Sequence, residues 1–309
     1  MIASSEQNGE PAFKSGFVAI LGRPNAGKST LLNYLIGQKL AIISPKPQTT
    51  RNAILGILTR DRFQIVFVDT PGIIEPKNLL NTSLIDAASR ATEDVDLVYH
   101  ITDVTDTRPE TQAVQKLLEL SRAPCFLLVN KIDRLKRNFD PASYPHLPDP
   151  SNYKEVFGIS ALKGDNIDYL LQRTLQHLKP GPLYYDPEQV SDRDLRFFTA
   201  EIIREKAFEL LGQELPYAVA VQVLEFEERK QGKFYIRAVI YVEQESQKGM
   251  IIGAGGGMLK KIGSLARPDI EILVDHPVYL ELWVKVRKNW TKKEHELRNF
   301  GYFPKKKKG

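Results

Sequence analysis

Residues 22–29 have the sequence Gly22-Arg-Pro-Asn-Ala-Gly-Lys-Ser29, which matches the phosphate-loop pattern G-x-x-x-x-G-K-[ST] at every fixed position. The apolar run 17–21 predicts a buried strand before the loop, and 29–36 predict a helix start after it. Gly22 and Gly27 allow backbone N–H groups to face phosphate oxygens, and the helix N-terminus adds positive potential. This stretch therefore predicts a phosphate site inside a strand–turn–helix unit.

Two residues of this loop have side chains that suit a nucleoside triphosphate and its metal. Lys28 can reach the β- and γ-phosphates, and the Ser29 hydroxyl can bind a bridging Mg²⁺ ion. A glycine-rich turn that binds nothing is the competing interpretation, and the Lys-Ser pair argues against it. We expect the nucleotide to contact Gly22, Arg23, Pro24, Asn25, Ala26, Gly27, Lys28, Ser29 and Thr30.

A carboxylate and a glycine end the predicted strand 63–69, in the sequence Asp69-Thr-Pro-Gly72. Phosphates bind along the carboxyl edge of such sheets, so Asp69 can hold Mg²⁺ through a water and the Gly72 N–H can face the γ-phosphate. The polar connection 44–51 could fold over the nucleotide, with Thr49 or Thr50 completing the metal shell. A plain solvent-exposed loop is the alternative there.

The motif Asn130-Lys131-Ile132-Asp133 follows the predicted strand 124–129 and suits recognition of the base. The Asp133 carboxylate can accept hydrogen bonds from the guanine N1–H and 2-amino group, and adenine offers no such pair of donors. The pattern therefore favours GTP over ATP. Ser160-Ala161-Leu162 follows the next predicted strand and would supply backbone N–H groups to the guanine O6.

Strand-like and helix-like periods alternate up to about residue 178 and predict an α/β fold, a mostly parallel sheet with helices on both faces. We expect strands near 17–21, 53–60, 63–69, 96–102, 124–129 and 154–159, and helices near 28–37, 78–92, 110–121 and 166–178. A chain of 309 residues with 42% hydrophobic content can bury two cores. We infer a leader 1–14, a GTPase domain 15–178, a Pro-rich linker 179–191, a second domain 192–291 and a basic tail 292–309.

The second domain has the predicted order α-β-β-α-α-β. Its elements are a helix at 192–211, strands at 218–228, 233–243 and 279–286, and the loop Gly253-Ala254-Gly255-Gly256 ahead of a helix. We expect one face of the first helix to carry Leu195, Phe198, Ile202, Phe208 and Leu211. A Gly-x-x-Gly loop in this order is typical of a KH domain, where it lets the backbone of about four unpaired nucleotides come close. A flexible turn is the alternative for the tetrapeptide alone.

Basic residues gather at the C-terminus, although the net charge of the chain is only +5. Residues 285–309 include ten Lys or Arg and two Glu. This cluster suits a polyanion such as nucleic acid and would also attract anionic lipid, and a solvated tail is the alternative for the Lys305–Lys308 run.

Several classes of protein are not indicated. The chain has no apolar run of the roughly 20 residues that a membrane helix needs and no signal-peptide pattern, so we expect a cytoplasmic protein. The single cysteine, Cys125, has no partner for an internal disulfide and lies in an apolar run, which favours a buried packing role. The five histidines never fall at metal-ligand spacing.

With both halves considered, the chain resembles the Era family of bacterial GTPases, in which a GTPase domain precedes a C-terminal type II KH domain. The resemblance covers about 15–303, and its most specific parts are 22–29, 47–51, 69–72, 130–133, 251–253 and 280–286. It implies hydrolysis of GTP to GDP and phosphate, selects Thr50 as the Mg²⁺-binding threonine, and marks 42–52 as the first switch. It also implies a role in maturing the small ribosomal subunit, with the KH domain holding single-stranded RNA at the 3′ end of its ribosomal RNA.

Two positions depart from wider patterns. A KH loop usually carries a basic residue between its outer glycines, and here the middle pair is Ala254-Gly255. We therefore expect a phosphate contact to be lost or moved to Lys260 or Lys261. Ile73 stands where many GTPases carry a water-positioning glutamine, and the Era family shares an apolar residue there.

Hydrolysis without that glutamine needs another cation near the β/γ bridge. The Asn25 side-chain carbonyl could help to hold K⁺, in line with a resemblance to potassium-stimulated GTPases with Pro-Asn-x-Gly-Lys-Ser loops. An Asn that only stabilises a tight turn is the alternative. The predicted catalytic residues are Lys28, Thr50, Gly72 and Asn25, and the predicted Mg²⁺ ligands are Ser29, Thr50 and Asp69.

Two other functions compete with that of a monomeric, RNA-binding GTPase switch. One is a non-catalytic RNA chaperone that uses the nucleotide only as a stabilising ligand. The other is a GTPase held at the inner face of the membrane by its basic tail, for which the sequence offers no lipidation motif.

Overall fold

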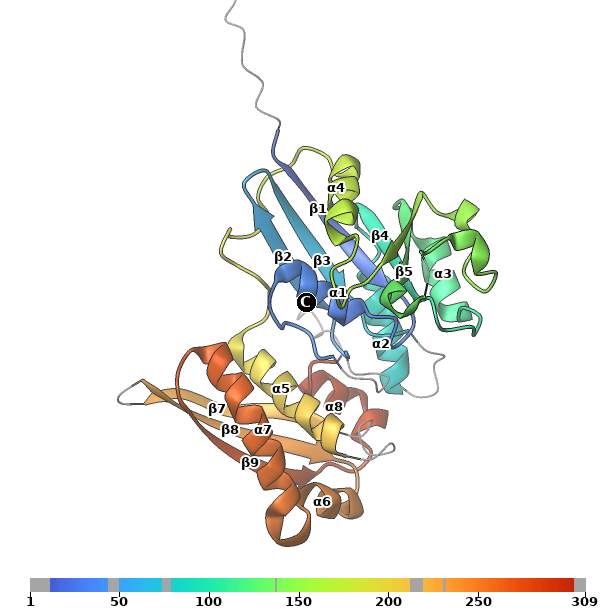
Figure 1. Cartoon of the computed structure of the whole chain (residues 1–309). Helices are drawn as coiled ribbons and strands as arrows, with labels where there is room; N and C mark the ends of the chain where they lie inside the picture. The colour runs from blue at the N-terminus through green and yellow to red at the C-terminus, as the bar shows by residue number, and fades with distance from the viewer. Residues whose placement is uncertain are drawn as a thin grey trace, which may run out of the picture.

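The computed structural model describes residues 12–43, 50–73, 79–136, 138–211, 219–229 and 232–302. The chain forms an N-terminal α/β unit and a C-terminal α+β unit, which lie one above the other in Figure 1. The C-terminal unit lies on the side of the α/β unit where helices α1 (Lys28–Ile36) and α2 (Leu79–Arg90) are found.

The N-terminal unit is built on a six-stranded sheet in the order β2-β3-β1-β4-β5-β6. β2 runs antiparallel to β3, and the other neighbouring strands are parallel. The strands are β1 (Lys14–Leu21), β2 (Ile54–Arg60), β3 (Phe63–Asp69), β4 (Leu97–Asp103), β5 (Cys125–Asn130) and β6 (Glu155–Ile159). Each predicted strand and helix of this unit is present, because apolar runs between turn residues fix them locally.

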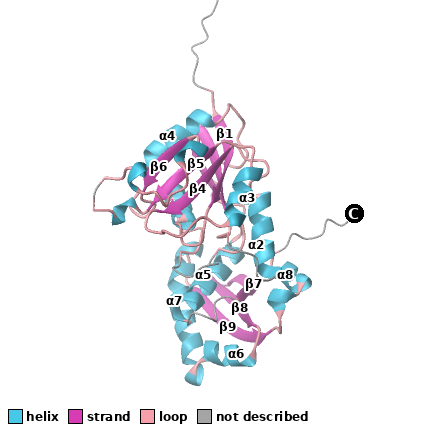
Figure 2. Cartoon of the chain, turned by 90° about the vertical axis from the view of Figure 1, so that its right-hand side faces the viewer, coloured by secondary structure: helices cyan, strands magenta, loops and turns pink. Residues whose placement is uncertain are grey.

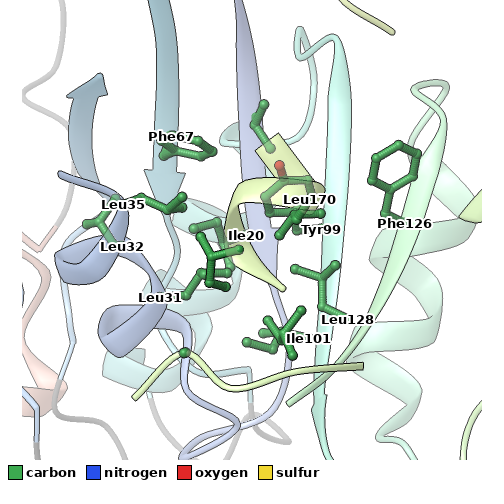
Figure 3. Packing of buried hydrophobic residues seen from close by; sticks show 14 of the residues in the cluster. Ile20, Leu31, Leu32, Leu35, Phe67, Tyr99, Ile101, Phe126, Leu128 and Leu170 are labelled. Carbon is green, nitrogen blue, oxygen red and sulfur yellow. The ribbon is translucent and has the colours of Figure 1, made fainter. Parts of the chain in front are cut away.

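Helices cover both faces of this sheet. α1 and α4 (Ile167–His177) pack on one face through Leu31, Leu32 and Leu170, as Figure 3 shows. α2 and α3 (Gln112–Leu120) belong to the apolar cluster on the other face. Burial on both faces explains why the central strands are nearly continuous apolar runs, and it leaves the carboxyl ends of the strands as the place for polar groups.

The C-terminal unit has a three-stranded sheet in the order β7-β8-β9, with β7 and β8 antiparallel and β8 and β9 parallel. Figure 2 shows its helices α5, α6 and α7 on one side of the sheet. The bounds are α5 (Leu195–Leu210), β7 (Ala220–Arg229), β8 (Lys233–Val242), α6 (Glu245–Ile252), α7 (Gly257–Val274) and β9 (Val278–Val286). This is the predicted order α-β-β-α-α-β.

The buried face of α5 differs from the predicted one at its start. Leu195 is 42% exposed, whereas Ile203 is fully buried. The first α5 side chain in the apolar cluster is Ile202, so the first two turns of the helix extend beyond the core of this unit.

Residues of the predicted linker 179–191 follow the edge of the N-terminal sheet. The Ile57 N–H donates to the Val190 carbonyl at 2.9 Å, and the Ser191 hydroxyl donates to the Leu55 carbonyl at 2.6 Å. The linker thereby covers part of the edge strand β2, whose unpaired backbone groups would otherwise face solvent.

The first part of the predicted basic tail is folded. A turn at Trp290–Lys292 leads into α8 (Glu294–Asn299), and Trp290 and Leu297 are fully buried. These side chains and Tyr302 pack against the C-terminal sheet and against Leu80 and Leu84 of α2, so this segment joins the two units. The prediction of a tail from 292 was wrong up to residue 302, because widely spaced apolar residues among the lysines provide the packing. Residues 303–309, with the Lys305–Lys308 run, lie outside the described residues.

No helix in the described part of the chain has the length and hydrophobicity needed to cross a bilayer.

This packing predicts unequal effects for the two tryptophans. Trp290→Ala should lower the free energy of unfolding by about 3–5 kcal/mol, since a large buried side chain is lost and leaves a cavity. Trp283 is 52% exposed, and Trp283→Ala should cost less than about 1 kcal/mol. Urea unfolding followed by circular dichroism measures both. Equal losses would contradict the packing of Trp290 between the units.

Candidate functional site

The phosphate loop connects β1 to α1 in a conformation that requires glycine. Gly27 has φ of +107°, and a Cβ there would lie 2.0 Å from the Asn130 side-chain nitrogen. The loop therefore closes against the end of β5, and its glycine allows both the turn and the close approach.

Lys28 lies inside the loop that precedes it. Its Nζ donates to the carbonyls of Gly22 at 3.0 Å and Arg23 at 2.9 Å, and the residue is 5% exposed. Burial lowers the pKa of this ammonium group to about 8, and the nearby carboxylates of Asp69 and Glu110 only partly offset the effect. A buried cation of this kind is well suited to meet an anionic ligand.

Ser29, Thr50 and Asp69 come together at the start of α1 and the end of β3. The Ser29 hydroxyl donates to Asp69 Oδ2 at 2.8 Å, and its oxygen is 2.9 Å from Thr50 Oγ1. Asp69 Oδ1 is buried and has no hydrogen-bond partner in the described part of the chain. Burial raises the pKa of Asp69 to about 6, against the opposing effects of Lys28 and Ser29.

This donor set fits Mg²⁺. Two hydroxyls and one carboxylate are the hard oxygen ligands that the ion prefers, and the unpaired Asp69 oxygen has no competing partner. Elsewhere, the described residues form no group of three or more His, Cys, Asp or Glu that could hold a metal ion. Thr49 lies outside the described residues, and Thr50 is the threonine that the structure brings to Ser29.

The segment after β3 lies against the phosphate loop. The Ile73 N–H donates to the Gly22 carbonyl at 3.4 Å, and a Cβ on Gly72 would lie 2.9 Å from the Pro24 Cα. The Ile73 side chain is 2% exposed and packs in the apolar cluster of α2 and α3. It cannot hydrogen-bond a water.

Asn130 connects the loops expected around the base. Its side-chain nitrogen donates to the Ala26 carbonyl at 2.8 Å, and its oxygen accepts from the Ala161 N–H at 2.9 Å. Asn130 is 2% exposed, so its amide serves to hold these two loops together. Sequence reasoning assigned this motif to the base and missed the bridging role, which arises only when the folded sheet brings the ends of β1, β5 and β6 to one edge.

The other residues of this pocket have distinct places. The Ser160 hydroxyl donates to Asp133 Oδ1 at 2.7 Å, and Lys131 Nζ donates to the Asn25 carbonyl at 2.8 Å and to Asp103 at 2.6 Å. Leu162 is 74% exposed. The phosphate loop and the two motifs predicted to bind the base, 130–133 and 160–162, thus meet at one edge of the sheet.

Arg23 has a different environment from the rest of the phosphate loop. Its guanidinium donates to the carbonyls of Arg108 at 3.1 Å and Pro109 at 2.9 Å, and it lies 3.6 Å from Asp106. The Arg23 side chain therefore binds the connection between β4 and α3. Only the backbone of Arg23 remains available to a phosphate.

The glycine loop of the C-terminal unit connects α6 to α7. Gly253, Gly255 and Gly256 have φ of +72°, +56° and +79°. A Cβ on Gly253 would lie 2.7 Å from the Met258 Cβ, whereas a Cβ on Gly255 or Gly256 would have no atom within 4 Å. The loop therefore packs tightly at its first glycine and is open to solvent at the other two. Ala254, Lys260 and Lys261 are exposed on the same segment.

Comparison with known proteins identifies this combination. The family model described as a 50S ribosome-binding GTPase matches residues 17–131, and the KH domain model matches residues 214–291. The chain is similar to a crystal structure of Era in complex with MgGDPNP and nucleotides 1506–1542 of 16S ribosomal RNA, with 38% identity over 94% of this chain and 100% of that one and a TM-score of 0.89. The chain belongs to the Era family. It is also similar to a tyrosine-to-alanine variant of Aquifex aeolicus Era bound to GDP·AlF₄⁻, with 37% identity over 94% and 100% of the two chains and a TM-score of 0.87.

Membership of the Era family confirms two predictions from the sequence. The fold is a P-loop GTPase domain followed by an α+β KH domain, and the activity is hydrolysis of GTP. GTP or GDP and Mg²⁺ are the ligands of this family.

The position of Asp133 predicts a change of base preference. Asp133→Asn should move preference from guanosine to xanthosine nucleotides, because the amide can donate to the 2-carbonyl of xanthine and can no longer accept both guanine donors. Competition binding with a fluorescent nucleotide measures the two affinities. GTP binding by the variant as tight as in the wild-type protein would mean that another residue reads the base.

Proposed function

We propose that this Era-family GTPase holds single-stranded RNA, at the 3′ end of the small-subunit ribosomal RNA, across Gly253–Gly256, and that its nucleotide state times this binding during assembly of the small subunit. The observation that carries the proposal is the presence in one chain of a phosphate loop and of a glycine loop with two positions open to solvent. Support comes from a relative crystallised with both MgGDPNP and nucleotides 1506–1542 of 16S ribosomal RNA.

In the proposed nucleotide site, GTP lies along the carboxyl edge of the N-terminal sheet. Lys28 exchanges its two loop carbonyls for β- and γ-phosphate oxygens, and the Gly72 N–H faces the γ-phosphate. Ser29, Thr50 and Asp69 hold Mg²⁺, which supplies positive charge to the phosphates when it is bound.

In the proposed hydrolysis step, water attacks the γ-phosphorus in line with the bond to the leaving oxygen of GDP. The Ile73 side chain is packed in the apolar cluster of α2 and α3 and gives the attacking water no hydrogen bond. Orientation of that water therefore falls to backbone groups around Thr50 and Gly72.

The RNA contact rests on shape as well as charge. Without side chains at Gly255 and Gly256, a sugar-phosphate backbone can come close to the N-terminus of α7, where backbone N–H groups and the helix dipole favour phosphate. Lys260 and Lys261, exposed on the first turns of α7, then replace the basic residue that this loop lacks. We expect Gly253 and Ala254 to contact the same stretch of RNA backbone.

A charge change in the loop tests the RNA proposal. The double change Gly255→Asp and Gly256→Asp should weaken binding of a 16S 3′-end oligonucleotide roughly tenfold or more, because two carboxylates then meet phosphate. Binding of GTP should remain within about twofold, since that site lies in the other domain. Gly249→Asp is a matched control, because Gly249 is an exposed glycine of α6 with open space at its Cβ position. Unchanged RNA affinity in the double variant would move the site elsewhere.

We propose that K⁺ supplies the positive charge that a catalytic glutamine or arginine does not provide. Asn25 has φ of +65° at the turn of the phosphate loop, and its backbone carbonyl accepts from Lys131. Its side-chain oxygen would hold K⁺ together with phosphate oxygens. The left-handed backbone equally suits an Asn that only stabilises the turn.

This proposal predicts faster GTP hydrolysis in KCl than in NaCl at equal ionic strength. The difference should shrink in Asn25→Ala, because one ligand of the ion is lost. Steady-state phosphate release measures both. Identical rates in the two salts would exclude the K⁺ site and leave RNA or a ribosomal protein as the source of the cation.

The proposal includes a cellular location and an oligomeric state. We place the protein in the cytoplasm, as a monomer, on the small ribosomal subunit. The matching GTPase family model names the 50S subunit, whereas the RNA in the crystallised relative is 16S, from the small subunit. A peripheral membrane contact is the second candidate, because Lys285, Lys288, Lys292 and Lys293 are all exposed in the segment that leads to α8, and exposed lysines attract anionic lipid. Co-sedimentation with anionic vesicles tests that contact.

A further inference from the structure

Arg51 is a buried cation between the two domains. It follows Thr50 directly in the chain, is 1% exposed, and lies among residues of the KH domain. Sequence reasoning placed it only at the end of the first switch, and nothing in the nucleotide chemistry described above uses its side chain.

Aromatic rings of the KH domain surround the Arg51 guanidinium. Its central carbon lies 5.7 Å from the centroid of the Phe208 ring, 5.7 Å from that of Trp290 and 5.6 Å from that of Tyr302. Its Nη1 donates to the Val219 carbonyl at 2.7 Å and to the Tyr302 hydroxyl at 3.4 Å. A desolvated guanidinium held by rings and a carbonyl has a well-defined position, which a lysine could not reproduce.

The chain on the other side of residues 44–49 is also held by the KH domain. The Ile43 N–H donates to Glu205 Oε1 at 3.4 Å, and Lys39 Nζ lies 2.6 Å from Glu205 Oε2. Glu205 belongs to α5 and is 2% exposed. The described residues that flank 44–49 are therefore fixed to the KH domain at both ends.

We propose that Arg51 is a positioning residue for Thr50. The guanidinium contacts with the KH domain described above, here called the seat of Arg51, determine whether Thr50 can complete the Mg²⁺ site. Thr50 and Arg51 are adjacent, with Cα atoms about 3.8 Å apart, so a backbone shift that follows loss of the guanidinium contacts would also move the Thr50 hydroxyl relative to Ser29. The 2.9 Å separation of the Thr50 and Ser29 hydroxyl oxygens exists with Arg51 seated. The inference rests on the proposed role of Thr50 as a metal ligand, and it makes the domain contact a control on metal binding.

Linkage makes this coupling reciprocal. If seating of Arg51 favours Mg²⁺ at Thr50, then Mg²⁺ with a GTP analogue must favour seating of Arg51 by the same factor. Trp290 reports the second effect, because its ring borders the guanidinium and is fully buried. Trp283→Phe leaves Trp290 as the only tryptophan of the chain.

The experiment measures the affinity of a fluorescent GDPNP analogue as Mg²⁺ is varied, in wild-type protein and in Arg51→Met, which keeps an unbranched apolar stem and removes the charged guanidinium. We expect Arg51→Met to raise the Mg²⁺ concentration needed for half-maximal effect by about tenfold, and to leave the affinity without Mg²⁺ within about twofold. Thr50→Ala should have a similar effect, and the double variant should be no worse than either single one, because both remove one coupled contact.

Val239→Ala is the matched control, since it thins the same interdomain apolar cluster without altering a charge. It should leave the Mg²⁺ requirement within about twofold of the wild-type value. In the Trp283→Phe background, addition of Mg²⁺ and GDPNP should change Trp290 emission, and Arg51→Met should abolish the change. Arg51→Lys keeps the charge and loses the planar guanidinium, so its Mg²⁺ requirement should lie between those of the wild-type protein and Arg51→Met. It replaces Arg51→Met in the experiment if that variant does not fold.

Equal shifts in Arg51→Met and Val239→Ala would overturn the inference, because the effect would then reflect general loosening of the interface. Additive effects of Thr50→Ala and Arg51→Met would also overturn it. Absence of any Mg²⁺ dependence in the wild-type protein would remove Thr50 as a metal ligand and this inference with it, and would leave the RNA site to be judged by its own variants.

Discussion

Two opposite charges buried at the carboxyl edge of the N-terminal sheet underlie the nucleotide site. Lys28 and Asp69 are both almost inaccessible to solvent. Burial lowers the pKa of Lys28 to about 8 and raises the pKa of Asp69 to about 6, and each shift favours the neutral form of the side chain. Burial of charges without full compensation is unfavourable, and one Asp69 oxygen has no partner among the described residues. In the proposed site, a phosphate at Lys28 and a metal at Asp69 would supply what is missing. The phosphate loop, the end of β3 and α1 are arranged around this need.

Most of the GTPase domain could be predicted because its signals are local. Apolar runs between turn residues gave each strand of the N-terminal sheet, and parallel strands bring their carboxyl ends to one edge. The meeting of Asp69 with Ser29, and of Asp133 with Ser160, follows from that rule alone. The glycine loop was also predictable, because it precedes a helix in the α-β-β-α-α-β order, and glycines carry no side chain to cover the backbone.

The contacts between domains could not be predicted, because they join residues far apart in sequence. Nothing near Arg51 indicates that its partners are residues 208, 219, 290 and 302. The folding of residues 292–302 was missed for a related reason. Trp290, Leu297 and Tyr302 are widely spaced among lysines, so the sequence pattern indicated a charged tail and not a packed segment. Asn130 similarly acquired its bridging role only through tertiary structure.

Crosslinking in cells can show whether this GTPase acts on the small ribosomal subunit through its glycine loop. The full-length protein would be crosslinked to RNA by ultraviolet light, and the RNA attached to peptides spanning residues 253–261 would be sequenced. We expect the crosslinks to concentrate in the unpaired 3′ end of 16S ribosomal RNA. Crosslinks concentrated in large-subunit RNA, or spread without preference over many RNAs, would contradict it.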